Sequence, residues 1–305
     1  MELLVVGGTG FIGTHLCAEL HDRGHEVTAM SRSPDDGGVP EGVEATAGDV
    51  TTYDSIEPAF EGVDAVVNLV ALSPLFRPSG GDEMHYRIHR DGTENVVAAA
   101  EKHGVDRLVQ LSALGADPDG ETAYIRAKGQ GEDIVRSSSL EWVILRPSVV
   151  FGDGGEFIPY TKQLAPAYLT PLPGGGKTRF QPIWIGDLAP MIADAATEDE
   201  HAGEIYELGG PEALTLASIA KLAHAADGRP VNVLPIPMAV AGAGLKALGS
   251  VPESVLDSLP GVPRMGGDQY RSLQFDNTTD ENDVAAFGVD SGTLRTVSDY
   301  LSIDD

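Results

Sequence analysis

The chain has 305 residues, of which 42% are hydrophobic and 22% charged, with a formal net charge of −27 at pH 7. This length and composition suit one large folded domain, or a core domain with a smaller cap, and do not favour a disordered chain. Because 47 acidic residues face only 20 basic ones, nucleic acid and anionic lipid are not expected as primary partners.

Strands and helices alternate through the first 150 residues. The apolar run Leu3–Val6 predicts a strand, and after a glycine-rich turn the spacing of apolar residues predicts a helix over 14–23. Further strands are predicted at 26–30, 43–47, 65–69, 108–111 and 142–145, and further helices at 51–60, 83–103 and 122–137. This alternation indicates an α/β fold with a Rossmann-type doubly wound parallel sheet, which binds ligands at the carboxyl ends of its strands.

From residue 151 the rhythm changes. Gly- and Pro-rich loops separate predicted helices at 158–164, 187–196 and 216–226 from short predicted strands at 179–185, 204–208 and 231–235. We therefore expect a dinucleotide-binding domain over 1–150 and a smaller mixed C-terminal cap over 151–305, with segments interleaved with the core. The partly helical tail runs from 284 to 301.

The glycine turn has the spacing Gly-x-x-Gly-x-x-Gly between a strand and a helix. Small residues there let the backbone approach a phosphate, which the helix N-terminus attracts; the alternative is a turn that only lets the helix pack tightly. Residues at the other strand ends should line the same dinucleotide site. The expected cofactor-binding residues are Gly7, Gly8, Thr9, Gly10, Phe11, Ile12, Gly13, Ser31, Arg32, Asp49, Val50, Val70, Ala71, Lys128, Pro147, Ser148 and Val149.

The end of the second predicted strand indicates which dinucleotide binds. A site for NAD usually has an acidic residue there, whereas this chain has Ser31 followed by Arg32. A guanidinium and a hydroxyl would bind the 2′-phosphate of NADP(H), so NADP(H) is favoured over NAD(H). The alternative is that Arg32 is a solvated loop residue.

Tyr124 and Lys128 lie four residues apart on a predicted helix and so share a face. An ammonium beside a phenol stabilises the phenolate, and we expect it to lower the pKa of Tyr124. A phenol tuned in this way can exchange a proton with a substrate oxygen while a hydride moves, and Lys128 would also donate to the nicotinamide ribose. The alternative is an ordinary pair on a surface helix.

Taken together, several segments resemble the short-chain dehydrogenase/reductase superfamily, extended type. They are the glycine turn, Asp49, residues 92–95, Tyr124 with Lys128, Arg146 with Pro147, and residues 184–189. The resemblance, which covers nearly the whole chain, implies a Rossmann core, Asp49 and Val50 beside the adenine, and Tyr124 as acid/base with Lys128 as its partner. Residues 111–116 resemble the atypical group around the NAD(P)H-binding accessory subunit of respiratory complex I.

The sequence departs from that superfamily at two catalytic positions. Leu114 stands where a Ser or Thr usually holds the substrate oxygen, and Ser112 either substitutes for it or only caps the strand end. The residues before Gly92 read His89-Arg90-Asp91, where the family tends to have an Asn.

Two functions therefore stay open. The first is an NADP(H)-dependent oxidoreductase acting on a small carbonyl, hydroxyl or nucleotide-sugar-like substrate, with Tyr124, Lys128 and Ser112 as catalytic residues. The second is a non-catalytic accessory or redox-sensing subunit that binds NADP(H) and presents its cap to a protein partner. The oligomeric state is open in both.

The eight histidines show no metal-binding pattern, so we expect no metal site. His85 and His89 lie four apart on the predicted helix, without a third ligand, and are expected on a solvated face. The acidic pairs at 35–36, 199–200 and 304–305 are expected to be solvated charge.

The expected compartment is the cytoplasm. Cys17 is the single cysteine and is expected to be buried, Met1-Glu2 leads straight into the first strand, and the apolar run Met238–Leu248 is too short to span a membrane. The acidity resembles that of proteins from salt-loving organisms, in which about 1 M salt shortens the Debye length to about 3 Å. A merely acidic protein from a low-salt organism is the alternative.

Overall fold

A seven-stranded parallel sheet forms the centre of the computed structural model, which describes residues 1–34, 38–75, 77–242 and 267–303. The strand order is β11-β6-β5-β4-β1-β2-β3. The strands are β1 (Glu2–Val6), β2 (Glu26–Ser31), β3 (Glu44–Ala47), β4 (Ala65–Asn68), β5 (Arg107–Leu111), β6 (Glu141–Pro147) and β11 (Ile205–Leu208). The order reverses between β1 and β4, and this is where ligands bind in such sheets.

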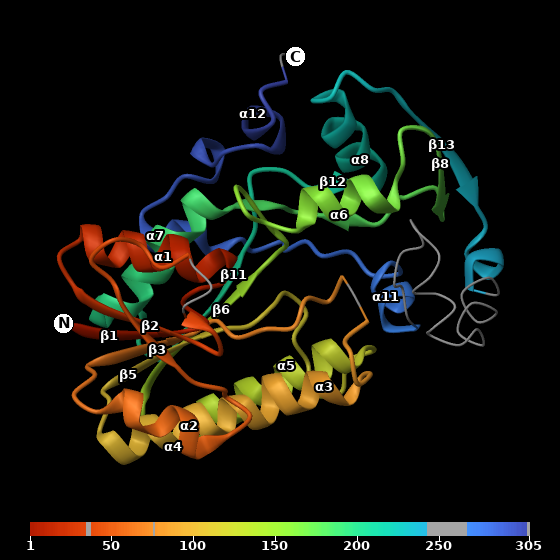
Figure 1. The fold of residues 1–305 in the computed structure, drawn as a ribbon. Coiled ribbons are helices and arrows are strands. Elements are labelled where there is room, and N and C mark those ends of the chain that lie inside the picture. Colours follow the sequence, from red (N-terminus) through yellow and green to blue (C-terminus); the bar gives the residue numbers. More distant parts are fainter. Residues whose placement is uncertain (35–37, 76, 243–266, 304–305) are drawn as a thin grey trace.

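Helices cover both faces of this sheet (Figure 1). Leu3 and Val5 of β1 belong to the core under α1 (Phe11–Asp22) and α7 (Ile185–Thr197). Leu4 and Val6 belong to the opposite core. That second layer contains α2 (Tyr53–Ile56), α3 (Glu83–His85), α4 (Gly92–His103) and α5 (Ala123–Arg136). Both faces of β1 are buried, which explains its uninterrupted apolar run.

The six strands and the helices predicted for the first 150 residues are all present, with ends shifted by a few residues. The predicted helix 83–103 is not uniform, because the π-helix η3 (Tyr86–Asp91) lies between α3 and α4. Wide helical turns of this kind are frequent at functional sites. Cys17 is buried, as expected.

Part of the second half returns to the central sheet. The predicted strand 204–208 is β11, which pairs parallel with β6 and extends the sheet rather than the cap. The strand predicted at 179–185 is split into β9 (Arg179–Phe180) and β10 (Ile183–Trp184), because α7 already begins at Ile185.

The remaining segments form a smaller layer at the carboxyl side of the sheet (Figure 1). Here α6 (Phe157–Leu164) and α8 (Leu216–Ala225) pack together through a small core that includes Phe157 and Ile219. The other elements are β7 (Val150–Phe151), β8 (Tyr168–Pro173), β12 (Leu214–Thr215), β13 (Val231–Ile236), α11 (Gly267–Ser272) and α12 (Val297–Tyr300), with 3₁₀ turns η2 (Glu57–Phe60), η4 (Asp199–His201), η5 (Asp283–Phe287) and η6 (Ser291–Thr293).

No helix within the described ranges is both long and apolar enough to cross a bilayer. Of the apolar run 238–248, residues 243–248 lie outside those ranges, as do the acidic pairs at 35–36 and 304–305.

Candidate cofactor and catalytic site

The glycine turn joins β1 to α1 by close packing. A Cβ on Gly8 would lie 2.6 Å from the Cβ of Ala29, and one on Gly13 would lie 2.3 Å from the carbonyl oxygen of Gly7. Gly7 has φ = +91°, and its N–H donates to the carbonyl oxygen of Met30 at 2.8 Å. Glycine is therefore required here by the fold itself, whether or not a phosphate binds.

The start of α1 is suited to an anion. Gly10 is the N-cap residue, no side chain caps the helix, and its first turn contains no acidic residue. The N–H groups of this turn therefore lack intrahelical acceptors and point out of the helix end, where the helix dipole favours negative charge. A pyrophosphate fits this position.

Polar groups follow the neighbouring strands, β2 and β3. The hydroxyl of Ser31 is buried and has no hydrogen-bond partner among the described residues. Burial raises the pKa of Asp49. Hydrogen bonds from Thr51 and the charges of Arg32 and Arg87 lower it by more, so the net shift of this pKa is downward. Two guanidinium groups thus lie within electrostatic range of one carboxylate.

Arg87 was not among the cofactor-binding residues predicted from the sequence. It lies on η3, far along the chain from β2, and only the packing of that helix brings its charge near Asp49. No spacing in the sequence links the two residues.

The motif at 92–95 contacts the loop after β3. A Cβ on Gly92 would lie 2.9 Å from Val50, and the side-chain amide of Asn95 donates to the carbonyl oxygen of Val50 at 2.8 Å.

Helix α5 begins beside the end of β5. The Thr122 hydroxyl accepts the N–H of Ile125, and the Asp268 carboxylate accepts the N–H of Ala123 at 2.8 Å. These two caps satisfy N–H groups of the first turn and hold Tyr124 at the start of the helix.

Lys128 is buried, with 3% of its surface exposed. Its ammonium donates to the carbonyl oxygen of Leu111 at 2.8 Å, and burial lowers its pKa to about 8. Burial raises the pKa of Tyr124. The expectation that Lys128 lowers the Tyr124 pKa is therefore wrong for this structure, because the ammonium is directed to a backbone carbonyl and the phenol is desolvated.

The prediction that His85 and His89 are solvated is also wrong. Their exposed fractions are 0% and 2%, and both rings pack edge-on against Tyr124. A Cβ on Gly131 of α5 would lie 2.4 Å from the carbonyl oxygen of His89, so this glycine allows α5 to approach η3 closely. Gly131 within the predicted helix was the signal of this close packing, whereas a Cβ on Gly129 would meet the backbone of Asp117 and Pro118.

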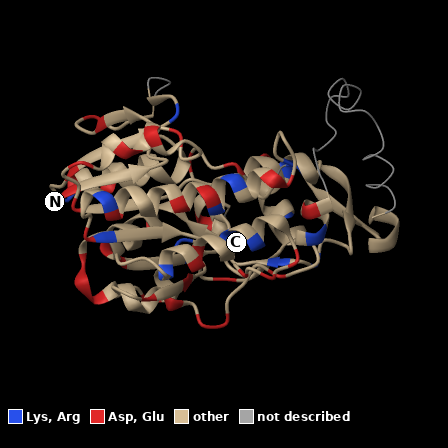
Figure 2. Cartoon of the chain, turned by 90° about the horizontal axis from the view of Figure 1, so that it is seen from below, with Lys and Arg blue, Asp and Glu red and all other residues tan. Residues whose placement is uncertain are grey.

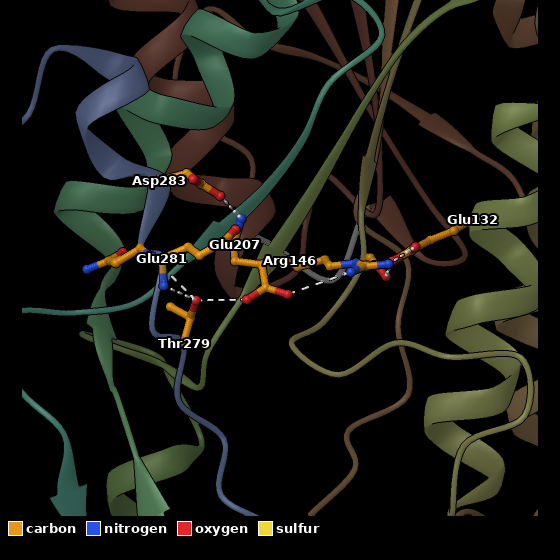
Figure 3. Close-up of polar contacts among 8 residues, drawn as sticks. Glu132, Arg146, Glu207, Thr279, Glu281 and Asp283 are labelled. Carbon is orange, nitrogen blue, oxygen red and sulfur yellow. Dashed lines mark hydrogen bonds and ion pairs between the residues drawn. The ribbon is translucent and has the colours of Figure 1, made fainter.

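Ser112 follows β5, but its hydroxyl donates to the buried carboxylate of Glu132. Glu132 also accepts two hydrogen bonds from Arg146, at 2.9 and 2.6 Å. Figure 3 shows Arg146 between Glu132 and Glu207, with a distance of 3.6 Å to the latter and with Thr279 donating to Glu207 at 2.7 Å. The donor proton of Ser112 is therefore already engaged by the protein, and sequence reasoning missed the carboxylate that engages it.

The other predicted residues lie at the same edge of the sheet. Val70 and Ala71 follow β4, and a Cβ on Gly7 would lie 3.4 Å from Val70. Ser148 donates to Asn277, whose side chain also accepts the N–H of Val149. Leu114 is buried and provides no hydroxyl at this edge.

One group of side chains within the described ranges has metal-ligand geometry. Glu198, Glu200 and His201 can each bring one ligand atom to within 4.8 Å of the others. Glu200 and His201 lie on η4 and Glu198 is its N-cap residue; η4 precedes β11, at the opposite end of that strand from the glycine turn. Asp199 is fully exposed, as expected, and its carboxylate pairs with Arg107 at 3.0 Å.

A parallel sheet with this switch point, a glycine turn and an uncapped helix N-terminus defines a Rossmann-type dinucleotide-binding protein. Comparison with known proteins agrees: the sequence profile of the NAD(P)H-binding family matches residues 7–162. The chain belongs to the NAD(P)H-binding family.

Its relatives have diverse names. The chain is 27% identical over 288 residues to the mitochondrial NADH dehydrogenase [ubiquinone] 1 alpha subcomplex subunit 9 of Arabidopsis thaliana, covering 91% of this chain and 71% of that protein. It is 32% identical over 260 residues to the 2-alkyl-3-oxoalkanoate reductase of Stenotrophomonas maltophilia (strain K279a), covering 75% and 77%.

Among solved structures, the fold is similar to that of the UDP-glucose 4-epimerase of Thermus thermophilus in complex with NAD. The TM-score is 0.71 at 22% identity, with 99% of both chains covered. The resemblance to short-chain dehydrogenases/reductases is thereby confirmed for the fold and for NAD(P) binding.

Proposed function

We propose that the protein is an NADP(H)-dependent oxidoreductase that reduces or oxidises a small carbonyl, hydroxyl or nucleotide-sugar-like substrate. The observation that carries this proposal is the position of Tyr124 and the buried Lys128 on α5, beside the end of β5, at the same edge of the sheet as the glycine turn after β1. A relative of this chain is named as a reductase of 2-alkyl-3-oxoalkanoates, which contain a carbonyl group.

The residues at the strand ends fit a dinucleotide. The uncapped start of α1 suits the pyrophosphate, and the unpartnered hydroxyl of Ser31 with the charges of Arg32 and Arg87 suits a 2′-phosphate. We therefore propose NADP(H) rather than NAD(H). Lys128 would hold the nicotinamide end of this cofactor, which would supply or accept the hydride.

The chain's own residues would handle the proton. In reduction, Tyr124 would give its phenolic proton to the substrate oxygen, and in oxidation it would take the proton back. Lys128 would hold the nicotinamide ribose and place a positive charge near the phenolate. The Ser112 hydroxyl, bonded to Glu132, would reach the substrate only if that bond is exchanged.

The test is Tyr124→Phe, measured as NADPH oxidation with a panel of ketones, aldehydes and nucleotide sugars. We expect turnover to fall by about 10²-fold or more, while NADPH affinity stays within about threefold. Tyr168→Phe is a matched control, because Tyr168 is 64% exposed on β8. Full activity of the Tyr124→Phe variant would refute the proposed role.

A non-catalytic role is the second candidate. Leu114 lacks the hydroxyl that would hold a substrate oxygen, Ser112 is engaged by Glu132, and one relative is a subunit of NADH dehydrogenase. In that case the cofactor would co-purify, and the cap would bind a protein partner. Turnover by the isolated protein would exclude this role.

We also propose that the protein works in the cytoplasm of a high-salt cell. Figure 2 shows acidic residues on helices and loops around the chain and far fewer basic ones. A net charge of −27 destabilises the compact state through self-repulsion unless salt screens it. A melting temperature that does not rise with KCl would contradict this proposal.

A further inference from the structure

The short turn before β11 brings an imidazole and two carboxylates together. Glu198 is the N-cap residue of η4, and Glu200 and His201 lie on this turn. One ligand atom from each side chain lies within 4.8 Å of the other two. Two donor atoms bound to the same zinc ion at about 2.1 Å are about 3.4 Å apart, so the site needs a closing movement of about 1 Å. Both glutamates are exposed, and their side chains are free to make it.

The imidazole of His201 is the buried member of this group. Its exposed fraction is 1%, and its Nε2 makes no hydrogen bond within the described part of the chain. This nitrogen faces Glu198, whose Oε2 lies 3.8 Å away, a separation too long for a hydrogen bond. A buried polar atom left unsatisfied in this way, opposite a carboxylate, marks a position that an ion or a water can occupy.

The second ring nitrogen of His201 has a partner that suits metal binding. Nδ1 lies 3.0 Å from the hydroxyl oxygen of Tyr206. With the proton on Nδ1, the ring donates to this oxygen, and Nε2 has a free electron pair on the side of the glutamates. Metal-binding histidines almost always have such a partner on the other nitrogen, which fixes the orientation of the ring. The ring also stacks on Phe287, with centroids 4.5 Å apart and an interplanar angle of 23°.

The charges around the turn favour a cation. Residues 198–204 contain four carboxylates and no Lys or Arg. Arg107 reaches this turn from β5, but its guanidinium pairs with Asp199 and Glu141, each at 3.0 Å, and donates to the backbone carbonyl of Glu198 at 2.7 Å. Its charge is therefore matched by carboxylates outside the ligand group. Among the described residues, no Lys or Arg side chain pairs with the carboxylates of Glu198 and Glu200.

We propose that Glu198, Glu200 and His201 bind one divalent transition-metal ion, for which zinc is the best candidate. An imidazole nitrogen suits zinc and its first-row neighbours, whereas magnesium and calcium prefer ligand sets made of oxygen. Three protein ligands leave one position of a tetrahedral zinc ion to water.

The bound ion stabilises the fold and does not reach the dinucleotide. The turn η4 lies at the opposite end of β11 from the glycine turn. Tyr206 of β11 packs edge-on against His201 and Phe287, with centroids 5.5 and 4.9 Å apart. Phe287 ends η5, so an ion on His201 fixes the point where η4, the start of β11 and the C-terminal segment meet.

The test is a calorimetric titration of the full chain, freed of metal with a chelator, with zinc chloride. We expect one zinc ion per chain, and we expect His201→Phe and Glu200→Gln each to weaken its binding by about tenfold or more. The Phe ring keeps the stacking on Phe287, and Glu200 is exposed, so neither change should prevent folding. His103→Phe is the matched control, because His103 also contacts a glutamate, Glu57, and should bind zinc like the wild type.

Two results overturn the site. Absence of zinc binding shows that His201 only faces Glu198 without an ion between them. Zinc binding that both variants retain, or that an excess of magnesium displaces, shows adventitious binding by surface carboxylates. Thermal unfolding gives a second readout: zinc should raise the melting temperature of the wild type by several degrees and leave that of Glu200→Gln unchanged. Equal rises in the two proteins also overturn the site, whereas NADPH affinity should be the same in both.

Discussion

The ammonium of Lys128 donates to the carbonyl oxygen of Leu111 at 2.8 Å, from a side chain of which only 3% is exposed. This contact ties the first half of α5 to the end of β5. It also places a desolvated cation at the carboxyl end of β5, where we propose that the cofactor binds. Burying this charge lowers the stability of the folded protein, and the size of this effect depends on pH.

Burial lowers the pKa of Lys128 from 10.5 to about 8. Between these values the unfolded chain binds more protons than the folded one, so the Lys128 contribution to stability rises with pH. Below pH 8 the buried charge opposes folding by about 3 kcal/mol, from about 1.4 kcal/mol per pKa unit. We expect Lys128→Met to raise the melting temperature near neutral pH while abolishing turnover. Above pH 10.5 the difference in melting temperature between this variant and the wild type should become smaller. Thermal unfolding of both proteins across this range provides the measurement; a variant that is less stable near neutral pH would contradict it.

Gly13→Ala tests the glycine turn. The new Cβ would lie 2.3 Å from the Gly7 carbonyl oxygen and 2.7 Å from the backbone of Gly8, so the turn must move. We expect a stability loss of about 1–3 kcal/mol and loss of NADPH binding. Gly10→Ala is the comparison for folding, because its Cβ meets only the Gly7 oxygen at 3.2 Å. Chemical unfolding and calorimetry with NADPH measure both effects; equal stability of the two variants would refute the packing argument.

Arg32→Glu and Arg87→Glu test the choice of cofactor. Each change replaces a guanidinium near Asp49 with a carboxylate that would repel a 2′-phosphate. We expect each to weaken NADPH binding by about tenfold or more and to change NADH binding by less than about threefold. Dissociation constants for both dinucleotides provide the measurement. Parallel losses for NADPH and NADH would show that these residues do not discriminate.

Glu132→Gln tests the buried network in Figure 3. Glutamine can still accept the Ser112 hydroxyl, but it leaves the Arg146 charge, which is 22% exposed, without its buried partner. Removing one member of a buried pair costs about 3 kcal/mol, and we expect the double variant with Arg146→Met to recover part of this. For comparison, Asp227→Asn removes the more exposed pair with Lys162 and should destabilise the protein much less than Glu132→Gln does. A double variant no more stable than Glu132→Gln would show that the unpaired charge is not the cause.

Local patterns in the sequence were sufficient for the first half of the fold. The apolar run of β1, the glycine turn and the helix after it are contiguous, so their order predicts strand, phosphate-binding turn and helix without knowledge of distant residues. The strand ends carrying Arg32, Asp49 and Ser112 follow from the same alternation, because parallel strands bring their carboxyl ends to one edge.

The tertiary structure decided which side chains are buried and which strands pair, because both depend on contacts between segments that are distant in the chain. His85 and His89 have the spacing of a solvated helix face, and they are buried only because Gly131 lets α5 approach η3. The strand β11 is short and lies in the half of the chain that was predicted to form the cap. Only its pairing with β6 places it in the central sheet. The sequence thus predicts where a dinucleotide would bind, whereas the packing of α5 determined the pKa shifts, the partners and the surroundings of Tyr124 and Lys128. Desolvation and hydrogen bonding depend on neighbours that are distant in the chain, and no local pattern encodes them.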